Sequence, residues 1–478
     1  MIPTSTANTP ELNGPGLADP LVGPLAGLLA TDSSSFLPTS AAANIERKQK
    51  EIRYQALKQS IHIEIVASLD LAAAEGLTPE QIQSQIRPFV KDYLERSDHR
   101  KLSEETKKRL EEELYDEMFG VGPLESLLKD HTVSDILVNN PYDIFIERSG
   151  QLEPSDVVFA DQQHLLRVIQ RIASFVGRRV DEVSPMVDAR LPDGSRVNAV
   201  IPPLALDGPK LSIRRFGKNR IHLADLIRNG SISEEIATFL CAAVRARCSI
   251  LISGGTGSGK TTLLNALSSQ IPEDERIVTI EDSAELMLQH RHVARLETRP
   301  PNSEGSGEYT QRDLLKNTLR MRPDRIIVGE VRGAEVLDML QAMNTGHEGS
   351  LTTVHANDSR DALLRLEMMI ALSGIELPLK VVRSYIASGI HLVVHVARLN
   401  GGVRRLTKVS EILRAEDGYK INDIFAYQRS GVDDSGKTTG HFEAFSYVPE
   451  CCTRIKEMGI EIDSEIFAAT NSLSQGAQ

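Results

Sequence analysis

The spacing of hydrophobic residues changes along the chain, and each change predicts a different kind of structure. Before residue 45 no period is visible, because prolines interrupt a stretch rich in Ser, Thr, Ala and Gly, so residues 1–45 are expected to be a disordered tail. Residues 46–130 place Ile61, Ile65 and Leu69 at helical intervals, which predicts an N-terminal helical bundle. We expect its last helix from about residue 103 to 118, and a flexible joint to the part that follows.

Between residues 131 and 218 the period shortens to that of strands. Two short runs flank the turn Asn139-Asn140-Pro141, and a hairpin is expected across Pro192-Asp193-Gly194-Ser195. One helix, 162–175, interrupts the predicted strands, which are 135–138, 143–147, 186–190, 196–200 and 210–216. The pattern predicts a small α+β domain, followed by a linker at 217–220.

From residue 219 to 430 short aliphatic strands alternate with helical stretches. The expected strands are 250–253, 276–280, 325–328 and 350–354, with a final hairpin made by 391–398 and 404–410. This alternation is typical of an α/β domain with a mostly parallel sheet and crossover helices. Residues after about 428 show no clear period, so 431–478 are expected to form an irregular C-terminal extension.

Composition narrows the classes of function. The formal net charge of the 478 residues is −12, from 54 Lys and Arg against 66 Asp and Glu, which opposes a nucleic-acid footprint over the whole molecule. The four cysteines form no Cys-x-x-Cys pair, so neither a disulfide framework nor a zinc site is indicated, and a reducing compartment is expected. No apolar run is long enough for a membrane helix, and no Lys or Arg precedes the apolar segment Leu21–Ala30 as a signal peptide requires. We expect a cytoplasmic protein whose membrane association is peripheral.

One stretch carries the strongest chemical signal. Directly after the strand 250–253, residues 254–261 fit G-x-x-x-x-G-K-[ST] and open a helix. Glycines let backbone N–H groups face a phosphate, and the helix N-terminus adds partial positive charge. Lys260 is expected to reach the β- and γ-phosphates, and Thr261 to place its hydroxyl on Mg²⁺. A glycine turn without a ligand is the alternative, which the order strand, loop, helix disfavours. The predicted nucleotide-binding residues are Gly254, Gly255, Thr256, Gly257, Ser258, Gly259, Lys260, Thr261 and Thr262.

Two of the predicted parallel strands end in carboxylates. Ligands bind at the carboxyl ends of such strands, so Glu330 is a candidate for holding Mg²⁺ through water or for orienting the attacking water. Glu281 is the candidate general base, because it comes first after its strand and near the phosphate loop. The plainer alternatives are an exposed Glu330 and a helix that starts after Glu281, with Asp282 or Ser283 as its N-cap and Glu285 in its first turn.

Histidines and arginines supply further candidates. His347 and His355 flank one strand, which favours a γ-phosphate sensor over the weaker alternative of metal binding. Guanidinium groups suit phosphoryl oxygens, so arginines of the α+β domain are candidates for contacts supplied across a domain or subunit boundary. Ordinary surface arginines are the alternative. The set is Arg190, Arg196, Arg214 and Arg215, with Arg320 and Arg322 inside the phosphate-loop domain.

Together these motifs resemble the secretion ATPases of type II and type IV systems, most nearly the CpaF branch that serves tight-adherence (Flp) pili. Four elements stand in the family's order: GGTGSGKTT, then IEDSAEL as the Asp box, RIIVGEVRG as a Walker B strand ending in Glu, and TGHEGSLTTVHAN as the His box. The segment LPDGSRVNAVIPPLALDGPKLSIRRF resembles the family's arginine-bearing N-terminal domain. The resemblance covers about residues 130–425, and the tetracysteine zinc module of type II enzymes is absent from the sequence.

The resemblance implies a RecA-like ATPase domain and a homo-hexamer, with ATP and Mg²⁺ between the two domains. It assigns phosphate and Mg²⁺ to Lys260 and Thr261, water activation to Glu281 and Glu330, and the His-box position to His355. It also implies work on polytopic inner-membrane platform proteins of a pilus, reached by peripheral contact. The acidic charge balance gives the separate expectation of no nucleic-acid partner.

The leading hypothesis is therefore an ATP-hydrolysing hexameric motor for assembly, or retraction, of a tight-adherence type IV pilus. The alternative is a RecA-like DNA-translocating or conjugation ATPase, which the acidic balance and the absence of aromatic-basic stripes disfavour. A nucleoside kinase or GTPase is disfavoured as well, because no N-K-x-D signature is present.

Overall fold

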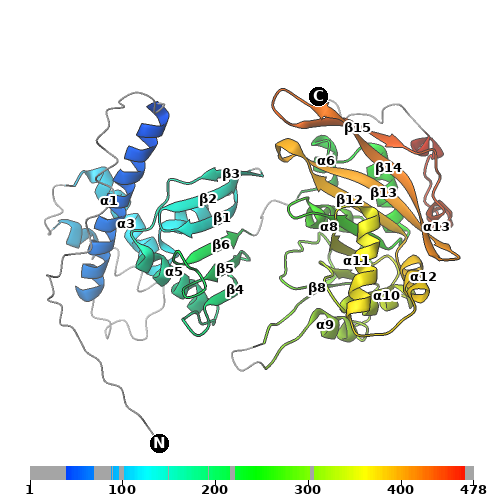
Figure 1. Ribbon diagram of the computed structural model, residues 1–478, viewed down its shortest axis with the longest axis horizontal. Coiled ribbons are helices and arrows are strands. Elements are labelled where there is room, and N and C mark those ends of the chain that lie inside the picture. Colours follow the sequence, from blue (N-terminus) through cyan, green and yellow to red (C-terminus); the bar gives the residue numbers. More distant parts are fainter. Residues whose placement is uncertain are drawn as a thin grey trace, which may run out of the picture.

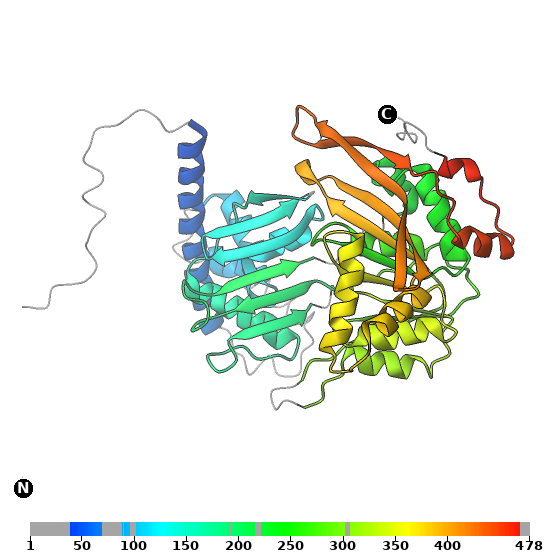
Figure 2. The same cartoon turned by 45° about the vertical axis from the view of Figure 1, so that its right-hand side comes forward.

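The computed structural model describes residues 39–68, 88, 90–95, 102–148, 150–191, 193–215, 221–301 and 306–468. The predictions for residues before 39 and for the linker 217–220 lie outside these ranges. Two lobes, each built on a sheet, stand side by side, and a long helix lies on the outer side of the first lobe (Figure 1). The same arrangement is visible after a turn of 45° (Figure 2). Among the described residues, no helix has both the length and the apolar character needed to cross a membrane.

The first N-terminal helix begins earlier than expected, and the helix expected at about 103–118 is found within one residue of those bounds. Helix α1 (Thr39–Ser68) is 30 residues long and starts inside the segment that was predicted to be disordered. The run Ala41–Ala43 explains the early start, because alanine has the highest helix propensity. Helix α3 (Glu104–Phe119) begins where the Ser103 hydroxyl accepts the N–H of Thr106 at 3.2 Å. Apolar side chains of both helices share one small core, which contains Ile61, Ile65, Val90, Leu94, Leu110 and Leu114.

A buried ionic cluster fastens these helices to the first sheet, so the expected flexible joint is wrong. The Lys58 ammonium on α1 lies 3.2 Å from Glu113 and 3.4 Å from Glu117 of α3, and the Lys58 side chain is only 1% exposed. Glu117 Oε1 is in turn 2.8 Å from Nε2 of His164, which belongs to helix α5 (Gln162–Phe175) of the sheet domain. Burial raises the pKa of Glu117, but the hydrogen bond and charge of His164 and the charge of Lys58 bring it down to about 2. Charged residues are hidden from a search for apolar periodicity, which is why the sequence did not predict this junction.

The α+β domain is an antiparallel sheet with the strand order β3-β2-β1-β6-β5-β4. Helix α5 covers one face and buries Leu165, Val168, Ile169 and Ile172 against the strands. The predicted strands and helix are confirmed, but the exposed edge strand β3 was not predicted, since it carries little apolar pattern. The remaining elements are η3 (Gly122–Leu124), α4 (Glu125–Lys129), β1 (Val133–Asn140), β2 (Asp143–Arg148), β3 (Gln151–Pro154), β4 (Met186–Arg190), β5 (Arg196–Val200) and β6 (Lys210–Arg214).

The second lobe is an α/β domain around a sheet with the order β15-β14-β13-β12-β7-β11-β10-β8-β9. Strands from β12 to β9 in this order run parallel, as predicted, and β13, β14 and β15 extend the sheet in antiparallel fashion. The strands are β7 (Ile250–Gly254), β8 (Ile277–Glu281), β9 (Val293–Glu297), β10 (Arg325–Val328), β11 (Leu351–His355), β12 (Leu392–Arg398), β13 (Arg404–Ala415), β14 (Gly418–Val432) and β15 (Thr438–Ala444).

The prediction of an irregular chain after residue 428 is wrong. The expected boundary at 430 falls inside β14, which pairs with β15 in the same sheet. Helix α13 (Cys451–Glu457) and η5 (Ser464–Phe467) then return to the core, where Ile455 and Phe467 are buried. This part is a layer of the α/β domain rather than an appendage.

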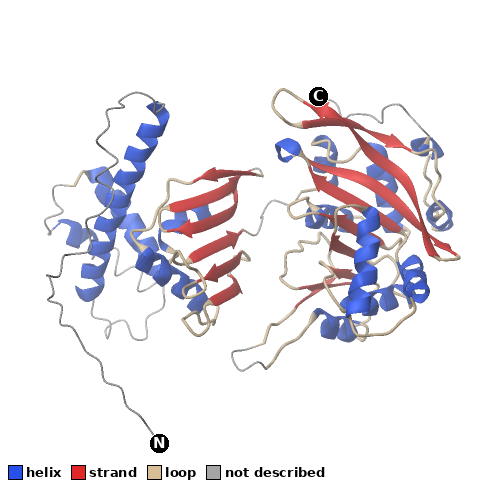
Figure 3. Cartoon of the chain, viewed as in Figure 1, coloured by secondary structure: helices blue, strands red, loops and turns tan. Residues whose placement is uncertain are grey.

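Helices pack on both faces of the central strands of the large sheet (Figure 3). Ile250 and Ile252 of β7 join the core formed with α7, α8 and α13, whereas Leu251 joins the core formed with α10, α11 and α12. A strand buried on both faces reads as a continuous aliphatic run, as in this sequence. The helices are α6 (Leu223–Arg228), α7 (Glu234–Arg245), α8 (Lys260–Ser268), α9 (Gln311–Thr318), α10 (Glu335–Asn344), α11 (Ser359–Leu372) and α12 (Leu379–Gly389), with η4 at Asn400–Gly402.

Candidate nucleotide site

The predicted phosphate loop connects β7 to α8 at the centre of the large sheet. Gly254 lies so close to β12 that an added Cβ would stand 2.3 Å from the carbonyl oxygen of Val396, so no larger residue fits. Gly259 caps α8 with a φ of 99°, which favours glycine. The loop therefore closes tightly, and it brings the first turn of α8 directly behind it.

The Lys260 ammonium lies inside this loop. Its Nζ donates hydrogen bonds to the carbonyl oxygens of Gly254 at 3.0 Å and Gly255 at 3.1 Å. Burial lowers the pKa of the Lys260 ammonium, because the charged form loses solvation there. An anion in the loop would restore the missing stabilisation of that charge.

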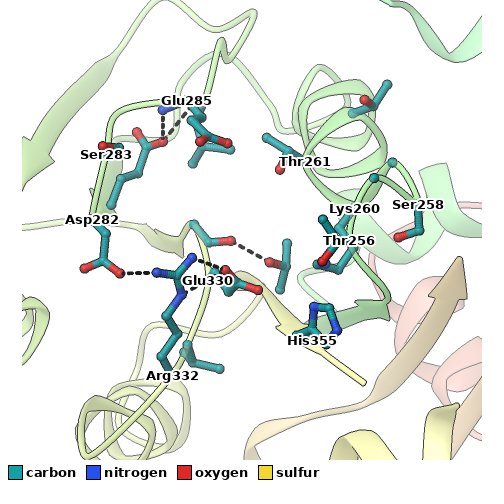
Figure 4. A pocket seen from close by; sticks show the side chains of 18 of the residues that line it. Thr256, Ser258, Lys260, Thr261, Asp282, Ser283, Glu285, Glu330, Arg332 and His355 are labelled. Carbon is teal, nitrogen blue, oxygen red and sulfur yellow. Dashed lines mark hydrogen bonds and ion pairs between the residues drawn. The ribbon is translucent and has the colours of Figure 1, made fainter. Parts of the chain in front are cut away.

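A cavity of about 610 Å³ opens in front of the loop (Figure 4), with walls from both domains. It contains most of the predicted site residues, which are Gly255, Thr256, Gly257, Ser258, Gly259, Lys260, Thr261, Thr262, Glu281, Glu330, His355, Arg196 and Arg214. Gly254 lies behind this lining, at the end of β7.

Glu281, the last residue of β8, is held in the cavity wall by one of its two carboxylate oxygens. Oε2 accepts the backbone N–H groups of Glu285 at 2.7 Å and Leu286 at 2.6 Å, and the residue is 2% exposed. Oε1 is buried and has no hydrogen-bond partner. Burial raises the pKa of Glu281 to about 7, against the opposing effect of the two N–H donors. A group with this pKa is suited to exchange a proton near neutral pH.

The alternative of a helix after Glu281 is wrong, because residues 282–292 form no helix. The backbone N–H groups that a helix cap would satisfy are satisfied instead by the Glu281 carboxylate itself.

Glu330 is tied into an ionic bridge rather than exposed. Its Oε2 accepts Nε of Arg332 at 2.9 Å and Nη2 of Arg332 at 2.6 Å. Arg332 Nη1 also lies 3.4 Å from Asp282 Oδ2, and Gln311 Nε2 donates to the Glu330 backbone carbonyl at 3.1 Å. Sequence reasoning missed Arg332 and Gln311, although Arg332 stands two residues after Glu330 in the same motif.

The two histidines that flank β11 lie at opposite ends of that strand, and one of them lines the cavity. His355 ends β11 beside the phosphate loop, in register with Gly254, and lines the cavity. His347 precedes β11 at the other edge of the sheet, where its carbonyl accepts the Ser350 hydroxyl at 2.8 Å, and it does not line the cavity. Only His355 remains a candidate γ-phosphate contact.

Two of the candidate arginines also line the cavity. Arg196 on β5 and Arg214 on β6 line the cavity and pair with Asp188 at 2.6 Å and Asp135 at 3.1 Å respectively. The hydrogen bond with Asp188 raises the pKa of Arg196.

Four other candidate arginines do not line this cavity, and a role for them across a subunit boundary stays a prediction. Arg190 pairs with Glu297 of β9 at 3.3 Å, and Arg215 donates to the carbonyl oxygens of Asp130 and Val133 inside the α+β domain. Arg320 and Arg322 lie outside the cavity wall as well.

Two further arginines of the α/β domain were missed. Arg404 of β13 donates from Nε to the carbonyl oxygen of Gly257 at 2.9 Å, and Arg365 of α11 lines the cavity. Behind the loop, a second cavity of about 430 Å³ has a largely apolar wall that includes Ile221, Leu226, Ile232, Leu263, Val396 and Leu406. No local sequence motif predicts that these residues lie near the loop, because they come from distant parts of the sequence.

The donors present fit a polyphosphate accompanied by a hard cation. The tight loop, the Lys260 ammonium and the cavity arginines suit phosphate oxygens. The Thr261 hydroxyl and the carboxylates of Glu281 and Glu330 are oxygen donors of the type that Mg²⁺ prefers. The unpartnered Oε1 of Glu281 also leaves one buried acceptor available in the same cavity.

Comparison with known proteins assigns the chain to a family. The family model described as "Type II/IV secretion system protein" matches residues 117–461. The chain belongs to this family. The match includes the whole of the cavity wall and both sheets, and it confirms the resemblance at family level.

Relatives of this type II/IV secretion system protein come from several bacteria. One relative is a Mycobacterium tuberculosis protein named for conjugal transfer. It is 40% identical over 328 residues, which is 67% of this chain and 93% of the relative. The type IV secretion system protein VirB11 of Bartonella quintana is 30% identical over 340 residues, or 63% of this chain and 93% of the relative. The crystal structure of the VirB11 ATPase of Brucella suis is similar at 31% identity and a TM-score of 0.33, and covers 60% of this chain and 94% of that one.

Proposed function

We propose that this secretion-family protein hydrolyses ATP in the cavity of about 610 Å³, with Mg²⁺ as cofactor. The observation that carries the proposal is the meeting of three groups in one cavity: the phosphate loop with Lys260, the buried Glu281 carboxylate, and Arg196 and Arg214 from the other domain. Each suits a different part of phosphoryl transfer to water.

The bound nucleotide supplies the phosphoanhydride bond, and Mg²⁺ neutralises phosphate charge. Lys260 and the loop hold the phosphates, and Thr261 and Glu330 orient the cation through oxygen donors. Glu281 Oε1 accepts a proton from water as the water oxygen bonds to the γ-phosphorus and the bond to the leaving oxygen breaks. Arg196 and Arg214 stabilise the charge that develops on the transferred group, and His355 contacts the same group from the end of β11.

The apolar cavity behind the loop is the proposed position of the nucleoside base. It shares Ser258, Gly259 and Thr262 with the phosphate loop or its helix, so a ligand that fills both cavities passes directly over the loop. Its apolar side chains suit the face of a flat aromatic ring.

We further propose that the protein works as a homo-hexamer that powers a tight-adherence type IV pilus. The support is the CpaF-like order of motifs together with family membership. In this proposal the ring is cytoplasmic and contacts the inner membrane peripherally, through polytopic platform proteins. A conjugation motor is the second candidate, because the Mycobacterium tuberculosis relative is named for conjugal transfer.

The test begins with phosphate release by the purified protein, with Lys260→Ala as the inactive control. Stimulation by DNA would favour the conjugation motor, and turnover indifferent to DNA favours the pilus motor. In the host, loss of surface pili on deletion, restored by the parent gene and not by Lys260→Ala, is the expected result for a pilus motor. No ATP turnover under any of these conditions would overturn the proposal.

A further inference from the structure

Arg332 joins two carboxylates that lie just beyond the carboxyl ends of the neighbouring parallel strands β8 and β10 (Figure 4). On one side it makes two hydrogen bonds to Glu330 Oε2, at 2.9 and 2.6 Å. On the other side its Nη1 is 3.4 Å from Asp282, the residue that follows Glu281. One guanidinium therefore connects the strand end that bears the candidate base with the strand end that bears the candidate magnesium ligand.

The backbone of Arg332 is held by hydrogen bonds, and its side chain is partly exposed to solvent. Glu335 Oε1 accepts the backbone N–H of Arg332 at 2.5 Å and that of Gly333 at 2.8 Å, and Glu335 is buried at the start of α10. The side chains of Arg332, Asp282 and Glu330 are 57%, 40% and 25% exposed. Exposed ion pairs of this kind exchange at low cost, so the guanidinium can move between the two carboxylates without moving the chain.

The bridge also conflicts with the role proposed for Glu330. Oε2 of Glu330 accepts two N–H donors from a cation, and a second cation cannot use the same oxygen at full strength. Whatever draws Glu330 toward Mg²⁺ must weaken its bond to Arg332, and by linkage Arg332 must weaken the hold of Glu330 on Mg²⁺ by the same factor.

We propose that Arg332 is a positioning residue that exchanges Glu330 for Asp282 when nucleotide and Mg²⁺ bind. The proposal rests on the proposed function as an ATPase. Asp282 is the partner that receives Arg332 when Glu330 leaves, and so it makes the release of Glu330 easier. This exchange joins the two acidic strand ends in one movement.

The proposal predicts opposite effects of two substitutions. Arg332→Gln frees Glu330 and lowers the Mg²⁺ concentration that half-saturates nucleotide binding, by about two- to fivefold if the pair is as strong as other exposed pairs. Asp282→Asn removes the receiving partner and raises that concentration by a similar factor. Arg332→Lys keeps the positive charge but loses the planar, bidentate geometry of the guanidinium. It is expected to lower the half-saturating Mg²⁺ concentration less than Arg332→Gln does.

The double variant separates exchange from simple charge effects. If charge alone acts, the two single effects add in the Arg332→Gln, Asp282→Asn protein. If Asp282 acts only by receiving Arg332, the double variant behaves like Arg332→Gln alone. Arg312→Gln is the matched control, since it breaks a similar pair, Arg312 with Asp338 at 2.6 Å, outside the cavity wall.

The experiment measures equilibrium binding of a fluorescent, non-hydrolysable ATP analogue to the full chain at rising Mg²⁺ concentration, so turnover is not needed. We expect the half-saturating Mg²⁺ concentration to decrease in Arg332→Gln, to increase in Asp282→Asn and to stay unchanged in Arg312→Gln. The double variant is expected to have the same half-saturating Mg²⁺ concentration as Arg332→Gln. Additive effects, or equal Mg²⁺ dependence in all variants, would overturn the exchange while leaving the ATPase proposal intact. If the parent protein fails to bind the analogue at any Mg²⁺ concentration, the proposed function fails, and this inference fails with it.

Discussion

If Glu281 is the general base, the pH dependence of turnover should report its ionisation. Burial raises the pKa of Glu281 to about 7, from an ordinary value of 4.5. Only the ionised carboxylate can accept the proton of the attacking water. Turnover is therefore expected to rise with pH and to reach its plateau above neutrality.

The size of the effect follows from that pKa. One pH unit below it, at pH 6, about a tenth of Glu281 is ionised, so kcat/KM, which reports ionisation of the protein without nucleotide, is expected at pH 6 to be about a tenth of its plateau. A carboxylate with the ordinary pKa of 4.5 would be almost fully ionised at pH 6 and would give a flat profile over the same range. The two cases differ by about tenfold, which a phosphate-release assay resolves easily.

Glu281→Gln supplies the second half of the test. The amide oxygen can still accept the N–H groups of Glu285 and Leu286, so the fold and nucleotide binding are expected to remain. Loss of the base should lower kcat by about 10²- to 10⁴-fold, with little change in analogue binding. A parent profile that is flat from pH 5.5 to 8, or a Glu281→Gln protein that turns over within a few-fold of the parent, would refute the assignment.

Three further predictions follow from the same contacts. Lys260→Ala should stop phosphate release and leave the circular dichroism spectrum unchanged, since the ammonium bonds only loop carbonyls. Arg214→Ala should lower turnover with little effect on urea unfolding, whereas Arg215→Ala should destabilise the α+β domain by about 1–3 kcal/mol, because backbone carbonyl oxygens lose their donor. Lys58→Met should lower the free energy of unfolding by about 3 kcal/mol, as measured by urea, because buried Glu117 loses a countercharge. Equal turnover and equal stability of Arg214→Ala and Arg215→Ala, or an unchanged urea midpoint of unfolding for Lys58→Met, would contradict these arguments.

The sequence predicted best what neighbouring residues determine together. The phosphate loop is one continuous segment in which glycines, Lys260 and Thr261 are placed by the strand before it and the helix after it. The strand ends at Glu281 and Glu330 were predicted for the same reason, because parallel strands present their carboxyl ends at one edge of the sheet.

Residues that depend on register or on distant contacts were not predictable. The spacing alone did not distinguish His347 from His355, although the family resemblance pointed to His355; the pairing of His355 with Gly254 explains why it reaches the cavity. Arg404 contacts Gly257, which is 147 residues away in the sequence. Arg214 and Arg215 are neighbours at the end of β6, but Arg214 pairs with Asp135 whereas Arg215 donates to the backbone carbonyl of Asp130. The outer strand β14 was missed because many of its side chains are exposed, and β15 because its sequence, TTGHFEA, contains few apolar residues; both features weaken the apolar alternation.

The balance of contacts around the cavity bears on how such a site can do mechanical work. Outside the cavity, the ion pairs that join the two domains within the described part of the chain are Arg190 with Glu297 at 3.3 Å and Arg398 with Glu147 at 3.9 Å, each partly exposed. Pairs of this kind contribute at most about 1 kcal/mol each. A hydrogen bond from a cavity arginine to phosphate contributes about 1.5–3 kcal/mol, so Arg196 and Arg214 together can outweigh both pairs. If the proposed phosphate contacts form, the relative position of the domains depends on what the cavity holds more than on these two ion pairs. In the proposed function, hydrolysis removes the phosphate that those two arginines are proposed to contact, and the domains are then expected to change their relative position.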